Sequence, residues 1–158
     1  MADLTKDRGY RLGPGPHHIR KYALDTSAAQ TVYMSQPMIQ SAASDQTYLR
    51  GWIDATAIAT NDRFVGICAS AQTSVLIAAT ETDCYVDVIC WGLVGFPTST
   101  LTDADAGKLV TMTDSSLQVV GTPAGANNLE IGYLAYVEDG YAYVMINGKT
   151  GGAPVLCA

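Results

Sequence analysis

The sequence predicts a small all-β domain: a compact β-barrel, β-tulip or sandwich with an extended N-terminal arm and little helix. Short apolar runs alternate with polar residues and are separated by turns rich in Asp, Asn, Ser and Gly, which is typical of antiparallel strands. No segment has a sustained apolar repeat of 3.6 residues bounded by helix caps. At 158 residues, the chain is long enough for one domain with a sizeable core.

The chain divides into three regions. Residues 1–22 form a basic arm, because five glycines and prolines between positions 9 and 16 leave no room for a helix or a paired central strand. We expect this arm to become ordered only where another structure holds it. Residues 23–147 form the β-barrel domain, and residues 148–158 form a C-terminal tail that contains Gly and Pro.

The strands are expected at short intervals, with one short helical candidate near residues 25–30. Alternation is clearest in residues 49–59 and 84–93. The final hairpin turns at Glu138-Asp139-Gly140, where glycine supplies the positive φ that a tight turn needs. The expected strands cover residues 31–34, 49–59, 64–70, 74–79, 84–93, 109–113, 117–120, 131–137 and 141–146.

Charge is scarce and unevenly placed. Charged residues make up 15% of the chain, against roughly a quarter in an average protein. Such a surface is typical of one that partners cover, or of a β protein rich in small residues. Residues 1–22 hold five basic and two acidic residues, a net charge of +3, and the remaining residues hold four basic and thirteen acidic residues, a net charge of −9. The total of −6 argues against nucleic-acid binding, while the basic end suits an acidic protein surface.

Neither a membrane segment nor a reactive cysteine motif is predicted. The longest apolar run, residues 88–96, is too short to cross a bilayer. The first residues contain no apolar signal region, so we expect a soluble protein made in the cytosol. The four cysteines include no CxxC pair, which excludes a zinc ribbon or a thioredoxin-like motif, and we expect buried free thiols.

The sequence contains no recognisable catalytic site. The only histidines, His17 and His18, lie in the arm, which is a poor place to hold a general base. Asp103 and Asp105 suggest a carboxylate pair or a calcium loop, but the later ligands of an EF-hand are missing, so we interpret them as a polar turn. We therefore expect no enzyme activity, no catalytic residues, no cofactor and no metal.

Tyrosines are the better lead, and four of them gather at the final hairpin. Tyrosine is favoured at interfaces because it combines contact area with a polar tip. Cross-strand pairing that only stabilises the sheet is the alternative, and both interpretations stay open. These tyrosines are Tyr133, Tyr136, Tyr141 and Tyr143.

Several segments resemble the capsid cement or decoration proteins of tailed bacteriophages. Residues 105–110 (DAGKLV), residues 130–134 (EIGYL) and the terminal Asp-Gly hairpin match that family's pattern in order and spacing. Residues 61–68 (NDRFVGIC) resemble its "x-D-R-F-V-G-V-A" strand, and residues 26–34 resemble its early turn and strand. The resemblance covers roughly residues 24–147. The basic arm, which varies among such proteins, does not map onto the family residue by residue, and no family role carries over to the four cysteines.

The resemblance implies a structural role on a virus particle. It implies a homotrimer made in the host cytoplasm and located on the outer capsid surface of the virion. There it would bind the major capsid protein and stabilise contacts between its subunits, with no direct contact to nucleic acid or membrane. We assign the capsid contact to the basic arm, through Lys6, Arg8, Tyr10, Arg11, Arg20 and Lys21.

Two other functions are considered. The first is a virion-associated β-module, part of a head fibre or tail, that binds a glycan or receptor through exposed aromatic residues such as Trp52 or Trp91. The second is a small trimeric β enzyme, which the lack of an ordered histidine or a nucleophile motif disfavours.

Overall fold

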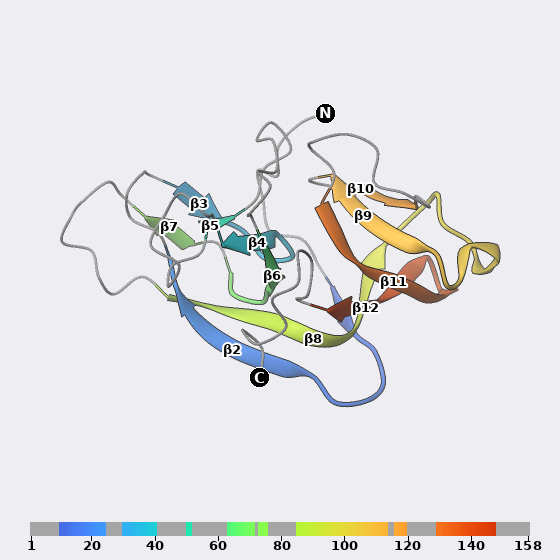
Figure 1. Ribbon diagram of the computed structural model, residues 1–158, viewed down its shortest axis with the longest axis horizontal. Helices are drawn as coiled ribbons and strands as arrows, with labels where there is room; N and C mark the ends of the chain where they lie inside the picture. The colour runs from blue at the N-terminus through green and yellow to red at the C-terminus, as the bar shows by residue number, and fades with distance from the viewer. Residues whose placement is uncertain are drawn as a thin grey trace.

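A computed structural model describes residues 10–24, 30–40, 50–51, 63–71, 73–75, 85–113, 116–119 and 129–147. Within these ranges the chain is nearly all β, and its antiparallel sheet curls into a half barrel (Figure 1). The only helical element among the described residues is the 3₁₀ turn η1, Asp103–Asp105. The predicted fold class is therefore confirmed.

The main sheet has ten strands, and a separate two-stranded sheet pairs β3 (Gln30–Val32) with β7 (Thr73–Val75). Eight strands of the main sheet follow one path, and β1 and β2 join it at β8. The path runs β10 (Ser116–Val119), β9 (Leu109–Thr113), β11 (Leu129–Glu138), β12 (Tyr141–Asn147), β8 (Tyr85–Pro97), β6 (Arg63–Cys68), β4 (Pro37–Gln40) and β5 (Arg50–Gly51).

The long strand β8 organises the sheet. One of its edges pairs first with β12, over residues 91–97, and then with β6, over residues 88–89. The opposite edge pairs with β1 (Arg11–Leu12) and β2 (His18–Ala23), and Figure 1 shows β2 running beside β8. Within the described part of the basic arm, two short strands therefore lie along the outer edge of β8.

Two clusters of buried side chains lie against β8. The larger cluster fills the half barrel, and β9, β11, β12, β8, β6 and β4 all contribute to it, with Phe64 and Ile89 among its members. The smaller cluster lies near the two-stranded sheet and includes Val65, Val88 and Cys90. Phe64 and Val65 are neighbours on β6, so alternation along one strand serves both clusters.

A bulge in β8 changes which face of the strand is buried. His18 of β2 is opposite Trp91, but the next residue, Ile19, is opposite Ile89, which leaves Cys90 as the extra residue. An extra residue of this kind reverses the alternation of side chains beyond it. Residues 88–90 are all buried because both faces of β8 are covered there: Ile89 belongs to the larger cluster, and Val88 and Cys90 belong to the smaller one.

Several strand boundaries differ from those expected. β8 reaches Pro97 rather than residue 93, because its apolar run continues to pair with β12. β4 was not predicted, since Pro37 suggested a break. Pro37 instead begins the strand, a position where the missing N–H is tolerated. Of the strand expected at 49–59, only residues 50–51 are described, and of the helical candidate near 25–30 only Gln30, which begins β3.

Asp103 and Asp105 form the polar turn that the sequence suggested. The Thr102 N–H donates to Asp105 Oδ2 at 3.0 Å, and Lys108 Nζ donates to Asp105 Oδ1 at 3.1 Å. The Val137 N–H donates to Asp103 Oδ1 at 2.8 Å, which attaches the turn to β11. Both carboxylates therefore act as acceptors that fix the entry to β9.

This turn predicts a pH effect for Asp105→Asn. The pKa of Asp105 is lowered, first by the hydrogen bond from the Thr102 backbone and then by Lys108. A carboxyl group with a lowered folded-state pKa stabilises the fold above its unfolded pKa, and this stabilisation is lost as the pH falls through the folded pKa. Urea denaturation should show the Asp105→Asn variant less stable than wild type at neutral pH, with the gap closing in acid. A gap that is constant with pH would contradict the assignment.

Candidate protein-docking surface

One face of the main sheet carries large apolar and aromatic side chains outside the core. Leu93 of β8 is opposite Met145 of β12, and Met145 is opposite Tyr133 of β11. Opposed residues on antiparallel strands point to the same face, so these three side chains form a row. Tyr133 is 58% exposed and Met145 is 36% exposed. The adjacent residues Val144 and Leu134 are buried in the larger cluster, so the row lies on the outside of the half barrel.

Tyrosines extend this row toward the β11–β12 hairpin. The rings of Tyr136 and Tyr143 stack with centroids 4.7 Å apart and an interplanar angle of 19°. Tyr143 also lies over Gly95, where an added Cβ would come within 2.8 Å of its Cε1. Tyr141 is two residues from Tyr143 on β12 and therefore shares its face. We call the surface formed by these side chains the tyrosine face: Leu93, Tyr133, Tyr136, Tyr141, Tyr143 and Met145.

Arg11 is held at the border of the tyrosine face. It is opposite Gly95 in the β1–β8 register, and its Cζ lies 3.8 Å from the centroid of the Tyr141 ring, a cation–π contact. The pKa of the Arg11 guanidinium is raised, first by hydrogen bonding with the Tyr143 side chain. Arg11 forms no ion pair within the described part of the chain. Its charge is thus positioned without being neutralised there.

The Gly/Pro-rich segment between β1 and β2 is anchored on β8. The Gly13 N–H donates to the Leu93 carbonyl oxygen at 2.8 Å, and His17 Nε2 lies 2.7 Å from the same oxygen. Gly92 has a φ of +126°, and an added Cβ there would come within 2.6 Å of His17 Cδ2. These contacts give the segment a fixed path despite its composition.

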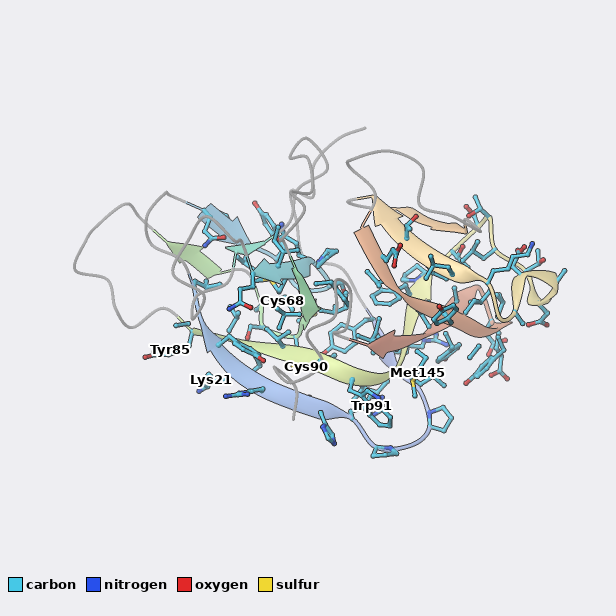
Figure 2. The ribbon with its side chains drawn as sticks, viewed as in Figure 1. Lys21, Cys68, Tyr85, Cys90, Trp91 and Met145 are labelled. Carbon is cyan, nitrogen blue, oxygen red and sulfur yellow. The ribbon has the colours of Figure 1, made fainter. Side chains whose placement is uncertain are left out.

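Trp91 lies next to the tyrosine face, two residues before Leu93 on β8. Its ring and that of His18 are tilted by 50° with centroids 5.5 Å apart. Figure 2 shows Trp91 beside Met145 at one end of the β2–β8 pair, with Lys21 and Tyr85 at the other end. The basic strand β2 therefore starts next to the tyrosine face and leads away from it.

Four of the six predicted capsid contacts lie along the edge of β8 that pairs with β1 and β2. Lys6 and Arg8 lie outside the described residues, and four of the six follow the edge of β8: Tyr10, Arg11, Arg20 and Lys21. Tyr10 is half-buried against the larger cluster, and burial is the main cause that raises its pKa. The Cζ of Arg20 lies 5.4 Å from the ring centroid of Tyr22. Lys21 is exposed and opposite Asp87. Tyr10 is thus an anchor of the segment, while Arg20 and Lys21 face solvent.

The described residues show little reactive chemistry. No group of three or more His, Cys, Asp or Glu in the described ranges could hold a metal ion. Cys68 and Cys90 are buried free thiols, as predicted, and the other two cysteines lie outside the described residues. No helix in the part of the chain that the structure describes is long and apolar enough to span a membrane.

Of the two interpretations of the hairpin tyrosines, cross-strand pairing is confirmed for one pair, and the interface role stays a prediction. Tyr136 and Tyr143 form a cross-strand stacked pair, whereas Tyr133 is exposed on the outer face. The sequence analysis missed Leu93 and Met145. For Met145 a signal existed, because it continues the alternation of Tyr141 and Tyr143 along the strand. Trp52, considered for glycan binding, lies outside the described residues.

A comparison with models of known protein families found no match, and a comparison with curated protein sequences found none either.

Proposed function

We propose that the chain is a capsid decoration protein with no catalytic role. In this proposal it is made in the host cytoplasm, assembles as a homotrimer, binds the major capsid protein on the outer surface of a tailed-phage head, and stabilises contacts between capsid subunits. The resemblance of residues 61–68 and 102–147 to that family suggests it. The observation that carries it is the tyrosine face, on which Tyr133 and Met145 are exposed, with a basic strand alongside, a combination suited to a protein partner.

The physical logic is that of many weak contacts repeated over a shell. Each copy needs only modest affinity, because subunits linked in a trimer bind neighbouring sites together and gain avidity. The exposed cations of β2 suit an acidic capsid surface, since the charge of the first 22 residues is opposite to that of the rest of the chain.

Reversing the charge of Lys21 on β2 tests whether this strand contacts the capsid. Wild-type protein is co-sedimented with expanded heads assembled from the major capsid protein encoded in the same genome. We expect Lys21→Glu to weaken binding by roughly tenfold, because an interfacial charge that favours association becomes repulsive. Deletion of residues 1–9 removes Lys6 and Arg8 together with Asp3 and Asp7, and it should weaken binding if those two cations contact the capsid directly. Deleting residues 1–21 is less informative, since it removes β1 and most of β2 from the edge of β8.

Two controls accompany this test. Lys21→Arg keeps the charge, and Asp139→Asn changes the exposed β11–β12 turn at the opposite end of β8. Both should bind as wild type does. Wild-type protein that fails to bind heads would exclude the decoration role, and unchanged binding by Lys21→Glu and the deletion would exclude the basic segment as the contact. Analytical ultracentrifugation of the free wild-type protein tests the homotrimer, because it gives the molecular mass in solution.

The glycan- or receptor-binding alternative rests on Trp91, whose partly exposed ring lies against His18. Aromatic faces are common platforms for ligands with one apolar side. Binding of the isolated protein to a glycan array, lost in Trp91→Ala and accompanied by no affinity for heads, would favour this function over decoration.

A further inference from the structure

The tyrosine face is apolar where the outer face of an antiparallel sheet is usually polar. Such sheets commonly bury one face and expose polar side chains on the other. Here the central row is Leu93, Met145 and Tyr133, and two of these side chains are exposed. Contiguous exposed apolar surface marks an interaction site more often than a chance feature.

We propose that the tyrosine face and Arg11 together form the docking site for one extended segment of the capsid protein, a segment that carries a carboxylate close to apolar side chains. The inference rests on the proposed decoration role. It adds the surface that makes the contact and the chemistry of the segment that the surface receives.

The geometry of Arg11 points to a carboxylate. Its guanidinium lies against the Tyr141 ring, with Cζ 3.8 Å from the ring centroid, so less side-chain freedom is lost on binding. Arg11 is exposed and forms no ion pair within the described ranges. A planar guanidinium can donate two parallel hydrogen bonds to one carboxylate, which gives a strong and directional contact.

Spacing links this carboxylate to apolar neighbours. Arg11 is opposite Gly95, and Leu93 is two residues from Gly95 on β8, which is about 7 Å of strand. An extended segment places the side chains of residues i and i+2 on one side at the same spacing of about 7 Å. The Arg11 guanidinium itself lies over Tyr141, which is opposite Pro97, four residues from Leu93. A carboxylate bound at Arg11 therefore places an apolar side chain two to four residues away along the segment within reach of Leu93 and Met145.

The apolar row can accept such side chains. Methionine is unbranched and adapts its shape to a partner, and Tyr133 offers a large surface with few rotatable bonds. The stacked Tyr136–Tyr143 pair lies between the row and the hairpin. Because the two rings restrict each other's movement, they offer a rigid surface to the bound segment. Rigid aromatic groups around a positioned arginine are the residues that usually dominate binding energy.

The test measures binding of full-length variants to expanded heads by co-sedimentation. We expect Arg11→Gln and Met145→Glu each to weaken binding by roughly tenfold or more, because one removes the partner of the carboxylate and the other places a like charge beside it. The affinity of Arg11→Lys for heads should lie between those of wild type and Arg11→Gln, since lysine keeps the charge but cannot form the bidentate hydrogen bond. Arg11→Gln should also make binding less sensitive to salt.

A matched control is Ala104→Glu, which places the same negative charge as Met145→Glu on the exposed 3₁₀ turn η1, outside both the tyrosine face and β2. It should bind like wild type. Urea denaturation of each variant shows whether the fold is retained, and Met145 is exposed enough for its replacement to be tolerated.

Each outcome decides a separate point. If wild type binds heads and Arg11→Gln and Met145→Glu bind equally well, the tyrosine face is not the docking site, although the decoration role stands. If wild type does not bind heads, the decoration role falls and this inference falls with it. If wild type self-associates and the same two variants are monomeric in sedimentation, the face receives a second copy of the chain, which also overturns the inference.

Discussion

Replacing Gly132 with alanine should destabilise the domain by about 3 kcal/mol or more, since a new methyl group would collide with backbone that has little freedom to move. Gly132 lies on β11 with a φ of +155°, and an added Cβ would overlap the carbonyl oxygen of Met145 on β12. β11 is irregular here: its register to β9 shifts between Glu130 and Gly132. Glycine lets two neighbouring strands approach at this irregularity. Urea denaturation followed by circular dichroism measures the loss.

Gly140→Ala provides the matched control. Gly140 also has a positive φ, +76°, but nothing lies within 4 Å of an added Cβ. Its replacement should therefore show only the cost of the left-handed conformation, about 1–2 kcal/mol. If both variants lost the same stability, the close approach at Gly132 would not be the cause. The EIGYL stretch, which contributed to the family resemblance, would then owe its glycine to some other constraint.

The sequence predicted well those strands in which apolar and polar residues alternate, because this alternation alone shows which side of the strand is buried. The hairpin of β11 and β12 is an example, because Asp139-Gly140 marks its turn and its apolar residues alternate on both sides. β1 and β2 were not predicted as strands. Their pairing depends on an open edge of β8, which lies some seventy residues later in the chain, and local composition rich in Gly and Pro gives no sign of it.

The candidate site was predictable only in part, for a similar reason. The tyrosines were visible as a group, and the alternation of strand residues was sufficient to place Tyr141 and Tyr143 on one face, although that step was not taken. The contact of Arg11 with Tyr141 was not visible, because it requires the β1–β8 and β8–β12 registers together. The bulge at Cys90 decides the side on which Leu93 lies, and a bulge leaves no clear mark in a single sequence.

Phe64→Ala should produce the largest loss among core substitutions, about 3–5 kcal/mol. Phe64 heads the fully buried side chains by volume and belongs to the larger cluster. Phe64 also lies on the strand that joins β4 and β5 to β8. β6 pairs with β8 through only two residue pairs, Ile67 with Ile89 and Cys68 with Val88. Just beyond β6, the Ala69 N–H donates to the Asp87 carbonyl oxygen and the Asp87 N–H donates to Ser70 Oγ, each at 2.8 Å. The packing of Phe64 therefore adds to a short set of hydrogen bonds that joins β6 to β8.

Val65→Ala is the matched comparison, because Val65 is the next residue on β6 and is equally buried, but belongs to the smaller cluster. Removing two methyl groups there should cost about 2 kcal/mol. Both variants should unfold in a single transition, with far- and near-ultraviolet circular dichroism coincident, because β6 and β8 contribute to both clusters. Two separate transitions in Phe64→Ala would mean that the clusters unfold independently. In that case the tyrosine face, which lies over the larger cluster, could be lost while the smaller cluster persisted.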